Sequence, residues 1–264
     1  MIGGGPGGLE AARVLAERGH RVVVYEANPI LGGQFALRAS IPNWHEFQSV
    51  INWRIKQLER NQVRIELGRT IKASDIHELE VDVIVLATGA RPKQQSIPGE
   101  EDSCIEVATP HDVILNVRPE ADKVVVWDHG GGLIGAGVIE ELVAKGKQVT
   151  VITPAFAVAE DVDLIQRVPF YERVLAAGTK FIANSRVSGF DGTNVVIENI
   201  YSRELTQLGP VDLLVSWQGS MAVDDLRPAI EASGIECHVI GDGLAPRTAE
   251  IAIAEGMLAA RNIA

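Results

Sequence analysis

The segment Gly3-Gly4-Gly5-Pro6-Gly7-Gly8 forms a glycine-rich turn of the pattern GxGxxG. In this pattern the first glycine permits a tight turn, the second lets the backbone approach a pyrophosphate, and the third allows close helix–strand packing. Apolar residues then recur at three- and four-residue steps, which predicts a helix over Gly7–Gly19. Free N–H groups and the positive dipole end of such a helix favour a phosphate at its start. The segment therefore predicts a dinucleotide-binding fold.

The strand expected at Arg21–Glu26 supports this prediction. It is rich in valine and ends at Glu26, whose carboxylate is suited to accept hydrogen bonds from a ribose diol. A dinucleotide fold also needs a strand before the glycine turn, and only Met1 and Ile2 precede Gly3. We expect a shortened central strand that weakens both the sheet and the site, and a truncated chain, either a fragment of a larger protein or one with an early-trimmed start.

The same order of elements recurs later in the chain. Gly130, Gly132 and Gly135 stand in GxGxxG register after the strand expected at Lys123–Asp128, and a helix and a second strand follow. This second strand ends at Thr153-Pro154, without an acidic residue or a nearby arginine to grip a 2′-phosphate. The repeat predicts a second nucleotide-fold unit, and its ending leaves open whether that unit binds NAD(P)H.

Short β-branched runs alternate with helical patterns, which predicts parallel strands with helical crossovers. The predicted fold class is α/β, with two Rossmann-like domains of the FAD/NAD(P)-binding, glutathione-reductase-like kind and the second inserted into the first. We expect residues 1–107 plus 208–264 to form the FAD- or ADP-binding domain, and residues 108–207 the NAD(P)-binding-like domain. The predicted strands are Arg21–Glu26, Arg64–Leu67, Val81–Thr88, Lys123–Asp128, Gln148–Thr153, Lys180–Ala183, Asn194–Glu198, Val211–Ser216 and Cys237–Ile240.

Composition excludes several classes of function. Hydrophobic residues make up 46% and charged residues 22% of the 264 residues, which is typical of a soluble globular protein. A net charge of −11 disfavours nucleic acids and anionic membranes as partners. Cys104 and Cys237 form no CxxC pair, which excludes a disulfide reductase and favours two free thiols. No histidine pair has metal-ligand spacing, so we expect no metal site. No signal peptide is visible, so we expect a cytoplasmic protein.

Further segments carry a family resemblance. Ala27 to Gln34 reads Ala-Asn-Pro-Ile-Leu-Gly-Gly-Gln, and Ile41-Pro42-Asn43, Ala87-Thr88-Gly89 and Gly241-Asp242-Gly243 follow later. With them, essentially the whole chain resembles the FAD/NAD(P)-binding portion of the NADH:flavin oxidoreductase group, which includes dienoyl-CoA reductase and trimethylamine dehydrogenase. In that group these domains follow an old-yellow-enzyme-like barrel that carries FMN and an iron–sulfur cluster.

The resemblance implies a flavin-dependent oxidoreductase that passes hydride or electrons between NAD(P)H, FAD and a barrel domain or partner. The alternative is a non-catalytic module that binds ADP or FAD and stabilises a trimethylamine dehydrogenase-like enzyme. Thr153 and Trp217 favour this alternative, since a small residue is usual at position 217 and an indole there would fill cofactor space. Gln34 and Asp242 favour the first. No catalytic residue is identified, because no proton donor or substrate pocket stands out.

The resemblance also implies a set of cofactor-binding residues. Glu26 would bind the adenosine ribose, Thr88 and Gly89 would lie near the adenosine, and Asp242 would bind the ribityl chain of FAD. Gly33 and Gln34 would lie along the dinucleotide, and the helix from Thr248 would point at the flavin. The expected residues are Gly3, Gly5, Pro6, Gly7, Gly8, Glu26, Ala27, Gly33, Gln34, Ala87, Thr88, Gly89, Gly241 and Asp242 for the first site, and Gly130, Gly132 and Gly135 for the second.

Overall fold

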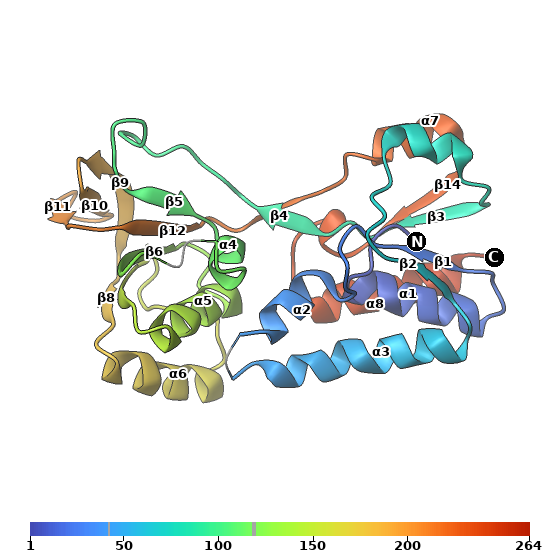
Figure 1. The fold of residues 1–264 in the computed structure, drawn as a ribbon, viewed down its shortest axis with the longest axis horizontal. Coiled ribbons are helices and arrows are strands. Elements are labelled where there is room, and N and C mark those ends of the chain that lie inside the picture. Colours follow the sequence, from blue (N-terminus) through green and yellow to red (C-terminus); the bar gives the residue numbers. More distant parts are fainter. Residues whose placement is uncertain (42, 118–119) are drawn as a thin grey trace. The chain divides into compact units, whose positions relative to one another are not determined.

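The structure is a computed structural model that describes residues 1–41, 43–117 and 120–264; Pro42 lies outside the described residues. The chain divides into two compact units (Figure 1). The first comprises Met1–Ser40, Trp44–Arg91 and Ser220–Ala264, and the second comprises Ile41–Asn43 and Pro92–Gly219. The second unit is thus inserted into the first along the sequence, as the fold class predicts.

The first unit is built on parallel strand pairs joined by Ile2. Strand β1 (Val23–Tyr25) pairs with β2 (Arg64–Glu66), and β3 (Val83–Leu86) pairs with β14 (Glu236–Val239). Ile2 bridges both β1 and β3. Its N–H donates to the carbonyl of Val85 at 3.0 Å, and its carbonyl accepts from the N–H of Ala87 at 2.8 Å. The expected short strand therefore takes the central position, directly before the first glycine loop.

Helices cover both faces of this sheet. Val85 faces a cluster with α1 (Pro6–Glu17) and α8 (Ala249–Asn262), whereas Ile84 and Leu86 face η2 (Ala73–Glu78) and α7 (Arg227–Ser233). This alternation follows from the period-2 geometry of a strand. The other elements of this unit are α2 (Gly33–Ala39), η1 (His45–Phe47), α3 (Gln48–Arg60), β13 (Ser220–Ala222) and η3 (Gly241–Gly243), and β4 (Ala90–Pro92) ends just beyond it.

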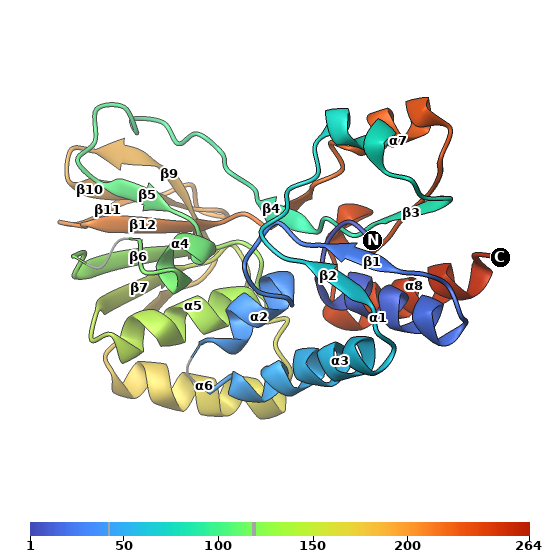
Figure 2. The ribbon, with the colours of Figure 1, turned by 45° about the vertical axis from the view of Figure 1, so that its right-hand side comes forward.

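The second unit contains a five-stranded parallel sheet in the order β5-β12-β6-β7-β8 (Figure 2). Val124 and Val126 of β6 pack against the helices, and Val125 packs against an antiparallel meander on the opposite face. The sheet strands are β5 (Glu106–Ala108), β6 (Lys123–Asp128), β7 (Gln148–Ile152), β8 (Lys180–Ile182) and β12 (Leu213–Trp217). The helices are α4 (Pro110–Ile114), α5 (Leu133–Ala144) and α6 (Leu164–Ala176), and the meander is β9 (Ser185–Asp191), β10 (Asn194–Asn199) and β11 (Leu205–Leu208).

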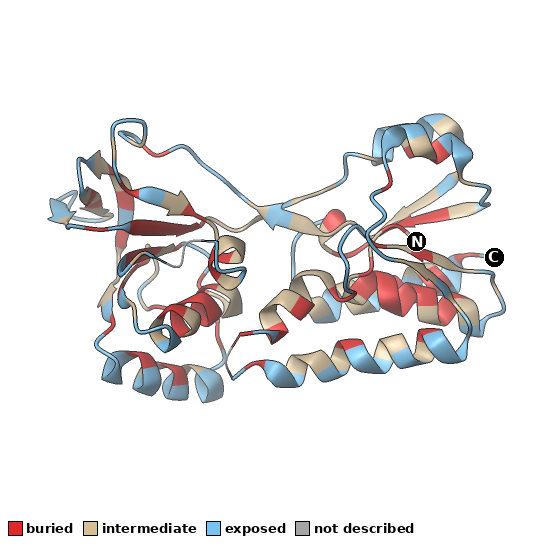
Figure 3. Ribbon diagram, viewed as in Figure 1, coloured by how far each residue is buried: buried red, intermediate tan, exposed pale blue. Residues whose placement is uncertain are grey.

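Figure 3 distinguishes the helices that follow the glycine loops from the other helices. Helices α1 and α5 are buried along most of their length, whereas α3 and α6 alternate between buried and exposed residues. Small and branched apolar residues account for this, since α1 and α5 pack closely on their own sheets. The two loops are therefore held by the best-packed helix of each unit.

All nine predicted strands are present, but the boundaries of the units differ from those expected. The second unit runs from Pro92 to Gly219 rather than from 108 to 207. The reason is strand pairing: β5 and β12 are neighbours in the second sheet, and β12 pairs with β6 through Leu214 and Val125. Residues 208–219, expected in the first domain, therefore belong to the second unit.

Candidate functional site

The first glycine loop connects Ile2 to α1, and its backbone leaves no room for a side chain at several positions, among them Gly3 and Gly8. Gly3 has a φ of +108°, and a Cβ there would overlap the carbonyl oxygen of Ala87. A Cβ at Gly8 would overlap the carbonyl oxygen of Gly3. A Cβ at Gly5, in contrast, would meet no atom within 4 Å. The loop therefore packs tightly on the sheet side and is open at Gly5, the position where the pattern expects a pyrophosphate.

The start of α1 leaves donors available at this opening. Gly5 is the N-cap residue, it makes no side-chain cap, and Pro6 occupies the first helical turn. The first N–H groups of a helix have no intrahelical partner, and here no capping side chain takes them. Together with the positive end of the helix dipole, they suit an anion. The first loop thus fits a pyrophosphate.

Glu26 lies directly beside this loop. Its side chain is only 5% exposed, and its Oε2 accepts a hydrogen bond from the N–H of Gly4 at 2.7 Å. Its Oε1 accepts from both the backbone N–H and the side-chain Nδ2 of Asn28, each at 2.8 Å. A carboxylate offers about four acceptor positions, so capacity remains for a ribose hydroxyl. Asn28, which orients Glu26, was not identified from the sequence; Ala27 between them is exposed.

The segment Gly32–Gln34 packs onto the same loop. Gly32 donates to the carbonyl of Gly4 at 2.8 Å, and a Cβ at Gly33 would lie 3.4 Å from Cα of Gly5. The side-chain Nε2 of Gln34 donates to the carbonyl of Ala90. Gly33 is therefore next to the open position of the loop, and Gln34 is hydrogen-bonded to the chain beyond β3.

The remaining first-site residues follow β3 and β14. The hydroxyl of Thr88 donates to the carbonyl of Val223, and the carbonyl of Gly89 accepts from the N–H of Val223 at 3.0 Å. A Cβ at Gly243 would lie 3.3 Å from the Thr88 hydroxyl, so the segment after β3 meets η3. The carbonyl of Ala87 lies against Gly3, as described above. These contacts gather both segments at the end of the sheet that carries the loop.

Asp242 is fixed by the turn that leads into α8. Its Oδ1 accepts from the backbone N–H of Arg247 at 2.9 Å, and burial raises the pKa of the Asp242 carboxyl. The N–H of Gly241 donates to Oε2 of Glu255 at 2.8 Å, and Glu255 also pairs with Arg247 at 2.5 Å. A Cβ at Gly7 would lie 2.7 Å from the carbonyl of Ala252, so α8 also touches the first loop. Glu255 and Arg247 are further residues that the sequence analysis missed.

The second glycine loop has a different conformation. Its positive φ, +60°, is at the middle residue Gly131. The N–H groups of Gly130 and Gly131 both donate to Oδ1 of Asp128, each at 3.1 Å. Asp128 is 0% exposed, and its pKa is raised to about 6, mainly by burial. A buried acid therefore lies directly under this loop.

Two further residues distinguish the second loop from the first. A Cβ at Gly130 would overlap Nε1 of the Trp217 indole, which is itself buried. The buried Thr153, which stands where the first unit has Glu26, accepts from the N–H of Ala155 at 3.3 Å. Gly132 caps α5 without a side-chain bond, and Gly135 packs on Asp128. A Cβ at Gly132 would meet only the carbonyl oxygen of Gly130, at 3.6 Å, so this loop is also open at the position equivalent to Gly5. It differs from the first loop in the buried carboxylate beneath it and the indole beside it.

The carboxyl ends of β6, β7 and β12 also border a cavity of about 500 Å³ in the second unit. Trp127, His129, Pro154 and Gln218 line it from these strand ends. The Nε1 atom of Trp127 is buried without a hydrogen-bond partner among the described residues. Open α/β sheets bind ligands at such ends.

Two classes of feature are absent from the described residues. None of their helices combines the length and apolar character that a membrane span requires. Within the same residues, no three His, Cys, Asp or Glu side chains gather as a metal ion would need. The arrangement instead offers backbone donors and carboxylates for a nucleotide.

Known proteins are similar to this chain in sequence and in fold. Residues 1–246 match the sequence profile of the family described as pyridine nucleotide-disulphide oxidoreductase. An NADH oxidase from Thermoanaerobacter brockii is 30% identical over 252 residues, which are 92% of this chain and 37% of that protein.

Solved structures show the same fold. Histamine dehydrogenase from Rhizobium sp. 4-9 is 24% identical, with a TM-score of 0.90 over 99% of this chain and 43% of that one. Thioredoxin reductase from Lactococcus lactis is 20% identical, with a TM-score of 0.70 over 98% of this chain and 95% of that one. The chain therefore spans less than half of the NADH oxidase and of histamine dehydrogenase.

Proposed function

This chain belongs to the pyridine nucleotide-disulphide oxidoreductase family, and from this premise we propose that its first unit binds FAD or ADP as part of a larger flavin-dependent oxidoreductase. The observation that carries the proposal is the open position at Gly5, where no atom would lie within 4 Å of a Cβ. Tightly packed Gly3 and Gly8 hold the loop on either side of it.

In this proposal the protein binds the adenine half of the nucleotide. The first N–H groups of α1 would donate to the pyrophosphate, and the helix dipole would add to the attraction. Glu26, oriented by Gly4 and Asn28, would accept from the adenosine ribose. Gly3, Pro6, Gly7, Ala27, Ala87 and Gly89 would provide the close backbone approach around it.

The other half of the site would lie along α2 and η3. When bound, FAD supplies a ring that accepts and releases hydride or electrons. Gly33, beside Gly5, would let the cofactor pass close to the backbone. The hydrogen bonds of Gln34 to Ala90 and of Thr88 to Val223 would hold the segments on either side of the cofactor in place. Asp242 would bind the ribityl chain.

We assign the remaining parts of the reaction to residues outside this chain. The relatives are longer, since this chain spans 37% of the NADH oxidase and 43% of histamine dehydrogenase. The iron–sulfur cluster implied by the resemblance needs cysteine ligands, and this chain has only two cysteines. The barrel, the FMN, the cluster and the final substrate would therefore belong to a further portion or a partner, in the cytoplasm.

A second candidate function is a non-catalytic module that binds ADP and stabilises the larger enzyme. The observation that favours it is the second glycine loop, where Asp128 takes two N–H groups and Trp217 lies against Gly130. A module of this kind would bind the nucleotide permanently and transfer no electrons.

One experiment tests the proposal and separates the two candidates. The full chain is purified, its visible absorbance is recorded, and any nucleotide released on denaturation is identified by chromatography. A flavin spectrum with released FAD supports the redox module, and bleaching by NADH or NADPH without oxygen would extend it. A colourless protein that releases ADP supports the structural module. Release of no nucleotide, together with no binding of added FAD or ADP, would contradict both.

A further inference from the structure

The two glycine loops share one hydrogen bond but make it in different ways. In each loop the N–H of the middle glycine donates to a carboxylate: Gly4 to Glu26 at 2.7 Å, and Gly131 to Asp128 at 3.1 Å. Glu26 reaches the loop from the end of the following strand, beside the ribose position. Asp128 reaches it from the strand before the loop, and Thr153 stands at the position of Glu26. The second unit thus satisfies its loop without a ribose-binding acid.

Asp128 also brings its charge to the start of α5. A Cβ at Gly135, in the first turn of that helix, would lie 2.6 Å from both carboxylate oxygens of Asp128. One oxygen takes the N–H groups of Gly130 and Gly131, and the other is buried without a partner among the described residues. A carboxylate here has the charge and the oxygens that a bound phosphate would bring to such a loop.

Two further residues, Asp161 and Trp217, lie close to the second glycine loop. Asp161 donates its N–H to the carbonyl of Gly131 at 3.0 Å, and its own carboxylate would lie 3.3 Å from a Cβ at Gly131. On the strand side, the buried Trp217 indole lies against Gly130, and the Trp217 carbonyl accepts from the N–H of His129 at 2.9 Å. The loop therefore has two acids close to its backbone and an aromatic wall on one side.

We propose that the buried charge of Asp128 beneath the second glycine loop, together with the Trp217 indole beside it, prevents NAD(P)H from binding there, so that nucleotides bind in the first unit alone. The inference rests on the proposed function of the first site. Its physical basis is repulsion: two negative charges a few Å apart in a poorly hydrated site oppose each other strongly. The glycine loop is a feature of the fold, whereas Asp128 determines whether this particular loop binds a nucleotide.

The test compares the wild type with Asp128→Asn, Trp217→Ala and the double variant. Each protein is first loaded with one equivalent of ADP to fill the first site, and NADH and NADPH are then titrated by calorimetry. Asp128→Asn keeps the shape of the side chain and removes its charge. Asp102→Asn is the matched control, because it makes the same charge change at an exposed position of the same unit. Circular dichroism verifies that every variant is folded.

We expect no saturable NADH or NADPH binding to the wild type or to Asp102→Asn. Asp128→Asn should gain affinity by about tenfold or more, and the double variant should gain further. Tight NADH binding to the wild type that Asp128→Asn leaves unchanged would overturn the inference, as would variants that bind no better than the wild type. The ADP step reports on the first site separately, so its failure would contradict the proposed function without deciding what closes the second loop.

Discussion

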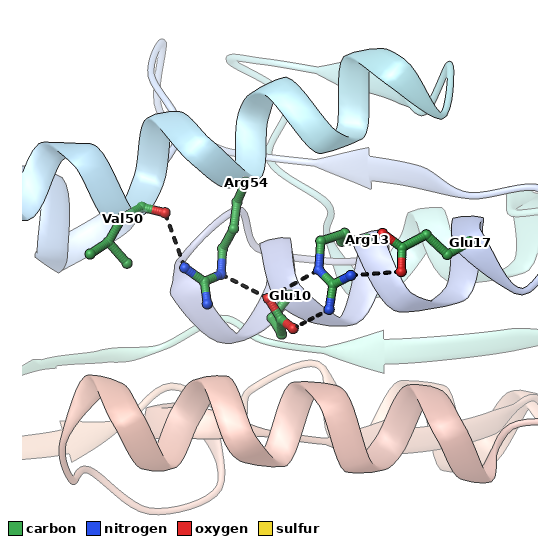
Figure 4. Close-up of polar contacts among 5 residues, drawn as sticks. All are labelled: Glu10, Arg13, Glu17, Val50 and Arg54. Atoms are coloured by element: carbon green, nitrogen blue, oxygen red, sulfur yellow. Dashed lines mark hydrogen bonds and ion pairs between the residues drawn. The ribbon is translucent and has the colours of Figure 1, made fainter.

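Nε of Arg54 on α3 donates a 2.9 Å hydrogen bond to Oε2 of Glu10, a residue of α1 whose carboxylate is buried (Figure 4). Arg13 pairs with the other oxygen of Glu10 at 2.6 Å and extends to Glu17 at 2.6 Å. Arg54 also donates to the carbonyl of Val50 at 3.0 Å. This network joins α3 to the helix that carries the first glycine loop, and it supports the site from behind.

Removal of Arg54 should therefore destabilise the first unit. Arg54→Met keeps the aliphatic bulk and leaves the buried Glu10 with Arg13 alone, and we expect a loss of about 1–3 kcal/mol in the free energy of unfolding. Arg227→Met removes an exposed pair with Glu231 and serves as the control, with no measurable change expected. Urea denaturation followed by circular dichroism measures both; equal losses would contradict a special role for Glu10.

Substitutions at Gly5 and Gly8 should separate an effect on nucleotide binding from an effect on folding. Gly5 has a φ of −73° and open space, so Gly5→Val should fold normally and lower the affinity for ADP by about tenfold or more, because its side chain enters the pyrophosphate position. Gly8→Ala should instead lower the free energy of unfolding by roughly 1–3 kcal/mol, since its Cβ overlaps the carbonyl of Gly3. Calorimetric titration and thermal denaturation distinguish the two. A Gly5→Val protein with unchanged ADP affinity would show that the pyrophosphate does not bind there.

The proposed hydrogen bond between Glu26 and the ribose 2′-hydroxyl can be tested by removing either group. Glu26→Gln should weaken ADP binding by roughly 1–3 kcal/mol, and 2′-deoxy-ADP should bind more weakly than ADP to the wild type. If Glu26 accepts from this hydroxyl, the two losses should not add, and Glu26→Gln should discriminate little between the ligands. Asn28→Ala should give a smaller loss, because it removes only the side-chain donor that orients Glu26. Fully additive losses would place the carboxylate away from the ribose.

The sequence was sufficient to predict the elements that position the first loop. Valine-rich runs such as that before Glu26 have one interpretation, and the glycine pattern fixes the order of turn, helix and strand. The family, the fold class and the oxidoreductase class were confirmed, whereas the assignment of individual residues to a cofactor stays a prediction. Short or polar strands such as β5 and β11 were missed, because they lack a run of β-branched residues.

The sequence did not reveal which sheet each strand joins or which side chains bind the second glycine loop. Strand Val211–Ser216 was predicted, but nothing in its residues indicates that it pairs with β6 rather than with the first sheet. Asp128 looked like the end of an ordinary strand, and only its position under Gly130 and Gly131 reveals its part in the loop. Glu10 and Arg54 lie far apart in the chain, so their contact depends on how α1 and α3 pack.

Asp128 also predicts how the stability of the second unit depends on pH. Burial, and to a lesser extent the charge of Asp161, raise the pKa of the Asp128 carboxyl from 3.8 to about 6, whereas the hydrogen bonds from Gly130 and Gly131 oppose that rise. Because the folded state binds this proton more tightly than the unfolded state, stability falls as the pH rises from about 4 to about 6.

Asp128→Asn should remove that fall. Between pH 4 and pH 7, its free energy of unfolding should gain roughly 2–3 kcal/mol relative to the wild type, in proportion to the size of the pKa shift. Asp102→Asn, at an exposed position, should follow the wild-type curve throughout. Urea denaturation at closely spaced pH values measures the three curves. Parallel curves for Asp128→Asn and the wild type would mean that the carboxyl ionises in the folded protein as it does in the unfolded chain. The charge of Asp128 under the second loop would then cost the folded protein no stability.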